Sequence, residues 1–71
     1  KLTFKRNTMF TMIEAVGISE KGLSEACAQA VEELNKLGHD VHFFEIVQQR
    51  GSVKSGKIQE YQVIIKAGIK S

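Results

Sequence analysis

A single amphipathic helical segment limits what this chain can fold into. Between residues 23 and 37 the apolar side chains follow one another at the spacing of one stripe on a helix. The stripe consists of Leu23, Ala26, Cys27, Ala30, Val31, Leu34 and Leu37, and the polar side carries Glu25, Gln29, Glu32, Glu33 and Lys36. One helix with one apolar stripe covers one face of a sheet and leaves the other face open.

The residues that flank the stripe predict the ends of this helix. Ser19 is a favourable N-cap residue, and Glu20 would place a negative charge in the first turn, where it suits the helix dipole. Gly38 follows the last stripe residue, and glycine commonly ends a helix in the left-handed conformation. We therefore expect the helix to begin just after Ser19 and to end before Gly38.

Three segments have the composition of β-strands. Residues 10–18, 41–50 and 57–69 are rich in β-branched and aromatic side chains, and the chain contains no proline. The last two segments are joined by GSVKSGK (residues 51–57), whose glycines and serines predict a turn, so these strands pair antiparallel. The sequence therefore predicts an α+β fold of order β-α-β-β, with a three-stranded antiparallel sheet packed on one long helix.

Alternation along the strands assigns side chains to the two faces of the sheet. The continuously apolar row of the third strand is predicted to lie under the helix: Tyr61, Val63, Ile65, Ala67 and Ile69. In the second strand we assign Phe44 and Ile46 to this covered face, and to the open face Val41, Phe43, Glu45 and Val47. Phe43, Val47 and Ile64 then form an uncovered apolar patch, which is typical of an interface or a ligand site.

Length and composition indicate how such a domain becomes stable. Seventy-one residues bury a modest surface, and Cys27 is the only cysteine, so the chain has neither an intrachain disulfide nor a zinc framework. Cys27 lies in the apolar stripe, which predicts a buried structural thiol. We expect self-association to supply the missing burial. No apolar run reaches membrane-spanning length, so we expect a soluble, cytoplasmic protein that contacts no membrane.

The net charge of +2 is unevenly distributed. Lys1, Lys5 and Arg6 precede Met9 without any acidic residue, whereas the remainder has seven basic and eight acidic residues and a net charge of −1. We therefore divide the chain into a basic leader, residues 1–9, and a domain, residues 10–71. The sequence of the domain does not indicate a basic patch of the kind that binds nucleic acid.

No constellation of residues predicts catalysis, so we expect a binding protein and not an enzyme. His39, Asp40 and His42 cluster before and within the second strand, but without a further ligand they do not predict a metal site. The glycine-rich turn after Arg50 is not followed by a helix and is therefore not a phosphate loop.

Several motifs, in their order, resemble the dodecin family of small flavin-binding proteins. They are EAVGIS (residues 14–19), FFEIVQQRG (residues 43–51) and GKIQEYQVIIKAGIK (residues 56–70). The resemblance runs without a gap from about Phe10 to Lys70. It implies the β-α-β-β fold, a hollow shell of twelve identical subunits, and pairs of flavins stacked at two-fold axes between the open sheet faces.

The resemblance also implies candidate ligand-binding residues. The family's stacking tryptophan falls on Phe43, and the glutamine that binds the flavin ring falls on Gln62. Basic residues that meet ligand phosphate in some relatives fall on Arg50 and Lys70. Glu45, on the predicted face of Phe43, completes the set. FMN or riboflavin is the expected cofactor, held for storage or sequestration.

Three departures from the family pattern make the predicted pocket more aliphatic. Phe43 replaces the tryptophan, Ile64 stands where relatives often have a small polar residue, and Ile18 replaces a threonine. Weaker flavin binding, another nucleotide cofactor such as coenzyme A, or no ligand at all are the alternatives. Phe43 is equally compatible with a subunit interface. Without the resemblance, the sequence favours a solvated strand position for Gln62 and ordinary surface positions for Arg50 and Lys70.

Overall fold

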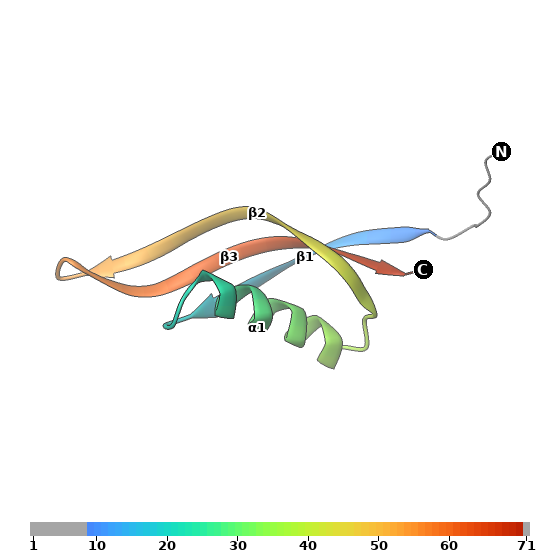
Figure 1. Cartoon of the computed structure of the whole chain (residues 1–71), viewed down its shortest axis with the longest axis horizontal. Helices are drawn as coiled ribbons and strands as arrows, with labels where there is room; N and C mark the ends of the chain where they lie inside the picture. The colour runs from blue at the N-terminus through green and yellow to red at the C-terminus, as the bar shows by residue number, and fades with distance from the viewer. Residues whose placement is uncertain (1–8, 71) are drawn as a thin grey trace.

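The computed structural model describes residues 9–70, so all of the predicted leader except Met9 lies outside the described residues. The elements are β1 (Phe10–Ser19), α1 (Leu23–Lys36), β2 (Val41–Lys54) and β3 (Lys57–Lys70). β3 lies in the centre of one antiparallel sheet of order β1-β3-β2, and α1 lies against one face (Figure 1). The predicted α+β fold and its β-α-β-β order are confirmed.

The helix begins later than the sequence predicts. Its N-cap is Gly22, whose carbonyl accepts a hydrogen bond from the Ala26 N–H (3.1 Å). Ser19 is the last residue of β1, and its hydroxyl accepts from the Lys21 N–H (3.0 Å), so it closes the turn before the helix instead of capping it. The N-cap assignment of Ser19 is therefore wrong, and Glu25 is the acidic residue of the first turn.

The C-terminal end of α1 agrees with the prediction. Gly38 has φ +94, in the left-handed region that favours glycine. Its N–H donates to the Asn35 carbonyl (3.0 Å), and the His39 N–H donates to the Leu34 carbonyl (3.1 Å). These two bonds form the Schellman arrangement, which satisfies carbonyls that the end of the helix leaves without partners.

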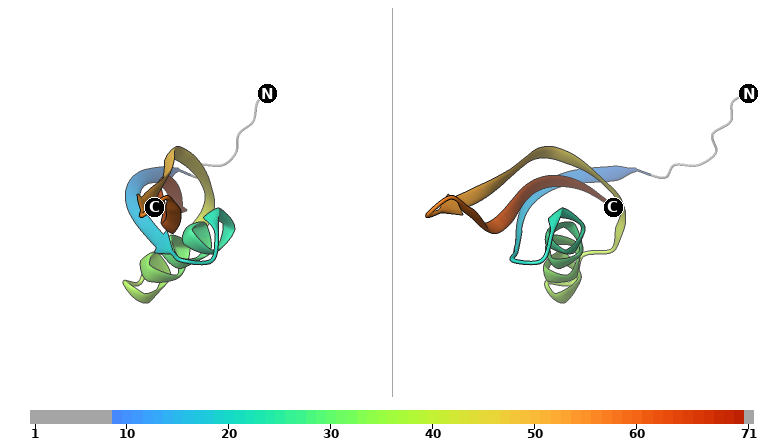
Figure 2. Two further views of the ribbon diagram at one scale, coloured as in Figure 1. Left: turned by 90° about the vertical axis from the view of Figure 1, so that its left-hand side faces the viewer. Right: turned by 60° about the vertical axis from the view of Figure 1, so that its left-hand side comes forward.

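β2 and β3 form a long hairpin that arches over the helix and extends beyond its N-terminal end (Figures 1 and 2). The predicted seven-residue turn is in fact a two-residue turn, because β2 continues to Lys54. Ser55 (φ 53) and Gly56 (φ 77) both have positive φ, as in the hairpin turns whose twist matches that of paired strands.

The core lies between α1 and the central part of the sheet. Its buried residues come from the helix stripe and from β3: Ala26, Cys27, Ala30, Leu34, Val63, Ile65 and Ala67. The buried state predicted for Cys27 is confirmed. Leu37 was also assigned to the stripe, but it follows the last helical residue and is 73% exposed, so that assignment is wrong.

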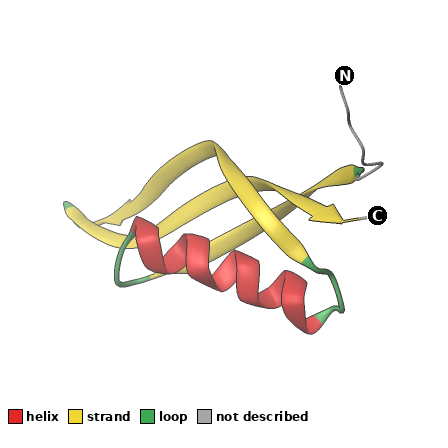
Figure 3. Cartoon of the chain, turned by 45° about the vertical axis from the view of Figure 1, so that its right-hand side comes forward, coloured by secondary structure: helices red, strands yellow, loops and turns green. Residues whose placement is uncertain are grey.

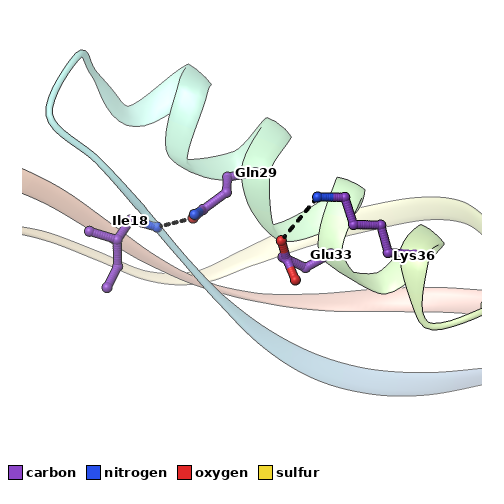
Figure 4. Close-up of polar contacts among 4 residues, drawn as sticks. All are labelled: Ile18, Gln29, Glu33 and Lys36. Atoms are coloured by element: carbon purple, nitrogen blue, oxygen red, sulfur yellow. Dashed lines mark hydrogen bonds and ion pairs between the residues drawn. The ribbon is translucent and has the colours of Figure 1, made fainter.

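Strand β1 and the helix approach each other closely at Gly17. A side chain at this position would collide with the backbone carbonyl of Ala26, so only glycine fits without a shift of the helix. Next to it, the Ile18 N–H donates to Gln29 Oε1 at 2.6 Å (Figure 4). This bond gives a backbone donor of an edge strand a partner on the helix. One turn further along α1, Lys36 pairs with Glu33 at 3.7 Å (Figure 4).

The helix packs mainly against β1 and β3 and has little contact with β2 (Figure 3). Phe44 pairs with Ala67 and therefore lies on the covered face, as predicted. It is nevertheless 44% exposed, and it lines an open groove of about 420 Å³ together with Cys27 and Val31. Phe44 is therefore on the covered face but not enclosed by the core, because α1 has little contact with β2.

Candidate ligand-binding face

The face of the sheet opposite α1, here called the open face, receives side chains from all three strands. The strand pairing assigns to it Phe10, Met12, Glu14, Val16 and Ile18 of β1, Phe43, Glu45, Gln48 and Arg50 of β2, and Gln62, Ile64, Lys66, Gly68 and Lys70 of β3. All five candidate binding residues predicted from the sequence lie on this face.

Two of the three irregularities in the pairing of β2 with β3 decide whether Val41 and Arg50 reach the open face. His42 is an extra residue between the pairs Val41–Ile69 and Phe43–Gly68. Val41 therefore lies on the covered face, where it packs against the core, and its predicted open-face position is wrong. The physical reason is that one inserted residue moves each preceding residue of the strand to the opposite face of the sheet.

The second irregularity, at Val47, brings Arg50 to Gln62. Ile46 pairs with Ile65 on the covered face, whereas Gln48 pairs with Ile64 on the open face, so Val47 is the extra residue. It belongs to a bulge and not to the regular open-face row that the sequence predicted. Strict alternation would have placed Arg50 on the side of Ile46. The bulge instead places Arg50 opposite Gln62.

Arg50 and Gln62 form the polar end of the open face. Arg50 Nε donates to Gln62 Oε1 (2.8 Å), and Gln62 Nε2 donates to Glu60 Oε2 (2.8 Å). A glutamine side chain has two acceptor lone pairs and two N–H donors. Gln62 thus keeps one acceptor site and one donor beyond these two bonds, and the network fixes the direction in which its amide points.

Phe43 forms the aromatic end of the open face. The outer atoms of its ring occupy the space into which a side chain of residue 68 would point, and Gly68 leaves that space free. The Phe43 ring meets the ring of Phe10 edge to face, with centroids 5.2 Å apart and planes at 70°. It is 45% exposed, so an uncovered part of its surface is available for contact. Lys70 lies on the same face, directly opposite Phe10.

The two ends of the open face are far apart within one subunit. Phe43 lies opposite Gly68, whereas Arg50 lies opposite Gln62, six residues earlier in β3. At about 3.3 Å per residue this separation is about 20 Å. Glu45, opposite Lys66, lies between the two ends. The subunit therefore brings Arg50 together with Gln62 and Phe43 close to Lys70, but it does not join the two pairs.

The sequence analysis missed the contribution of β1 to this face. Large apolar side chains stand exposed along the strand: Phe10, Met12, Val16 and Ile18. The alternation in FTMIEAVGIS carries this signal, since even-numbered side chains share one face. With the side chains of β1 included, the open face is more apolar than the predicted patch of Phe43, Val47 and Ile64 indicates.

Searches for two other kinds of site are negative within the described residues. No group of three or more His, Cys, Asp and Glu side chains in residues 9–70 is arranged to hold a metal ion. Asp40 and His42 do form a pair, with 3.0 Å between Oδ2 and Nε2. No helix in the described part of the chain is long and apolar enough to cross a membrane.

The architecture is that of a class of small α+β proteins. A three-stranded sheet holds one helix against one face and exposes aromatic and aliphatic side chains on the other. Comparison with known proteins places the chain within that class. Its sequence matches the Dodecin family over residues 9–70, and the chain belongs to this family. The Thermus thermophilus dodecin is 31% identical over 62 residues, which cover 87% of this chain and 90% of the relative.

Solved structures agree with the family assignment. The dodecin from Streptomyces davaonensis superposes with a TM-score of 0.87 at 27% identity, covering 93% of this chain and 97% of the other. The dodecin from Streptomyces coelicolor gives 0.85 at 29% identity, covering 92% and 93%. The fold expected from the resemblance is therefore confirmed.

Proposed function

We propose that this protein binds flavin for storage or sequestration, without catalysing a reaction, and that it assembles as a hollow homododecamer. The observation that carries the proposal is the half-exposed ring of Phe43, held over Gly68 on a sheet face that no element within residues 9–70 covers. An exposed aromatic ring on an apolar face suits the stacking of a flat ring system. Membership in the dodecin family supports riboflavin or FMN as the ligand.

Assembly is part of the proposal because a single subunit has an incomplete site. The separation of about 20 Å between Phe43 and Gln62 exceeds what one flavin ring system spans. A second subunit related by a two-fold axis would bring its own open face alongside, so that Phe43 of one protomer meets the polar end of its partner. The exposed apolar side chains of β1 support such a contact, because association would remove them from water.

Within this site each candidate residue has a distinct role. Phe43 stacks on the isoalloxazine ring, and Gln62, oriented by Arg50, hydrogen-bonds the ring edge through its remaining donor and acceptor. Lys70 stands near the aromatic end, where it would meet the phosphate of FMN. Glu45, opposite Lys66, balances the positive charge between the two ends.

Fluorescence titration of riboflavin and FMN tests the proposal, since stacking on Phe43 quenches flavin emission. Phe43→Trp enlarges the stacking surface at the same position and should tighten binding by about 1 kcal/mol per stacked ring. Phe44→Trp is the matched control: it adds the same ring on the other face of the sheet and should leave the affinity unchanged.

Light scattering on the same samples measures the size of the assembly. A twelve-subunit particle that quenches neither flavin would contradict flavin binding and retain only the shell. A monomer at micromolar concentration would contradict the assembly. Equal affinities of the wild type and an assembled Phe43→Trp protein would show that Phe43 does not stack on the ligand.

A further inference from the structure

We propose that Phe10 is a positioning residue of this site: its ring holds the Phe43 ring over Gly68, so that the two rings form one aromatic ledge across β3. The positioning is a property of the subunit itself. Its consequence for ligand binding rests on the proposed flavin-binding function.

The ledge depends on an unusual approach between the two edge strands. Phe10 on β1 and Phe43 on β2 flank the central strand, which would normally keep their side chains apart. They meet because Gly68 has no side chain, and any side chain there would overlap the outer atoms of the Phe43 ring. Gly68 does not have positive φ, so the contact uses the small size of glycine and not its backbone freedom.

The geometry between the rings is attractive and directional. A centroid distance of 5.2 Å and an interplanar angle of 70° describe an edge-to-face pair, the arrangement that the charge distribution of aromatic rings favours. Phe10 has a second aromatic neighbour. His42 meets its ring at 5.5 Å and 63°, and Asp40 holds the His42 imidazole at 3.0 Å. The order of contacts is therefore Asp40, His42, Phe10 and Phe43.

Holding Phe43 in place affects how well the site stacks on a flat ligand. An exposed phenylalanine without a neighbour samples several staggered rotamers, and a ligand must select one of them. Ordering one such side chain on binding typically weakens affinity by about two- to ten-fold. Phe10 removes that loss in advance, because the edge-to-face contact and the space over Gly68 fit one position of the Phe43 ring.

The experiment replaces Phe10 in the assembled protein. Phe10→Leu keeps an apolar side chain but removes the ring, and Phe10→Tyr keeps the ring. Leu37→Met is the control, since it exchanges one apolar side chain for another at an exposed position after the end of α1, away from the open face. Two quantities are measured: the position of the Phe43 ring in crystal structures, and the Kd for riboflavin from fluorescence quenching.

In Phe10→Leu we expect the Phe43 ring to leave its position over Gly68 or to occupy more than one rotamer, and the Kd to rise about two- to ten-fold. Phe10→Tyr should keep both quantities at their wild-type values, and Leu37→Met should change neither. A Phe43 ring that stays over Gly68 in Phe10→Leu, or an unchanged Kd beside a binding wild type, would overturn the inference.

The two proposals fail in different ways. If the wild type does not bind riboflavin, the proposed function fails, whereas the crystal structures still decide whether Phe10 positions Phe43. If Phe10→Leu does not yield folded protein, Phe10→Met provides the same test with a more adaptable side chain. An ordered Phe43 ring over Gly68 in Phe10→Met would overturn the inference equally.

Discussion

The covered and open faces of this sheet are built by the same three strands, yet within residues 9–70 large apolar side chains are fully buried only where α1 lies over the covered face. On the covered face, Val63 and Ile65 are 1% and 0% exposed under the helix. On the open face, Phe10 and Phe43 are 42% and 45% exposed. Alternation supplies both faces with apolar residues, but one helix shields only one of them. Within residues 9–70 these aromatic side chains of the open face therefore remain exposed.

Glycine is used on both faces for the same physical purpose, with different results. Gly17 lets the backbone of α1 approach β1 on the covered face, and Gly68 lets an aromatic ring lie across β3 on the open face. Neither residue has positive φ. On one face the missing side chain serves the packing of the fold, and on the other it shapes the surface of the candidate site.

The largest expected effect concerns the core. Ile65 is completely buried, so Ile65→Ala should leave a cavity and lower the free energy of unfolding by about 2–5 kcal/mol. Ile64→Ala is the matched control, because the neighbouring isoleucine points to the open face. Thermal unfolding of both variants at one protein concentration measures the difference. Equal losses would show that the two faces contribute alike to the stability of the assembled protein.

The next effect compares the two glycines. Gly17→Ala forces a methyl group against the Ala26 carbonyl, so the helix must shift, and we expect a loss of about 1–3 kcal/mol of stability. The nearest atoms that Gly68→Ala would meet belong to the side chain of Phe43, which can rotate away. This variant should retain more stability and lose flavin affinity instead. Unfolding curves and riboflavin titrations of both variants measure these effects. A larger loss of stability in Gly68→Ala than in Gly17→Ala would contradict the prediction.

The adjacent phenylalanines separate ligand binding from the helix side of the sheet. Phe43→Ala should weaken riboflavin binding by roughly 1.5–3 kcal/mol, the value of burying one such side chain. Phe44→Ala should leave binding unchanged, because Phe44 faces the groove beside α1. The titrations are compared after light scattering has verified equal particle size. Loss of binding in Phe44→Ala alone would reverse the assignment of the two faces.

The smallest expected effect distinguishes the two cationic residues. Lys70→Ala should weaken FMN binding about two- to five-fold, as expected for an exposed ionic contact, and leave riboflavin binding unchanged. Arg50→Ala breaks the hydrogen bond that orients Gln62, so it should weaken the binding of both flavins to the same degree. Titrations of each variant with FMN and with riboflavin, at low and at high salt, measure the ratio of the two affinities. A phosphate preference that depends on Arg50 alone would place the FMN phosphate at the polar end.

The sequence by itself determined the elements and most of the face assignments. The period of the helix stripe, the glycine after it and the alternation in β3 are local patterns, and each follows from the geometry of one element. They were sufficient for the β-α-β-β order and for placing Phe43 and Phe44 on opposite faces. Ser19 misled because a good cap residue also closes turns.

Only the tertiary structure decided how the strands register and where the helix lies. The apolar pattern does not indicate that His42 and Val47 are extra residues, because a bulge is selected by pairing with a strand that is distant in sequence. They moved Val41 to the covered face and Arg50 to the open one. The meeting of Phe10 and Phe43 across Gly68 likewise joins residues remote in sequence, which no local period encodes. Contacts of this kind arise from packing, where non-local burial outweighs local preference.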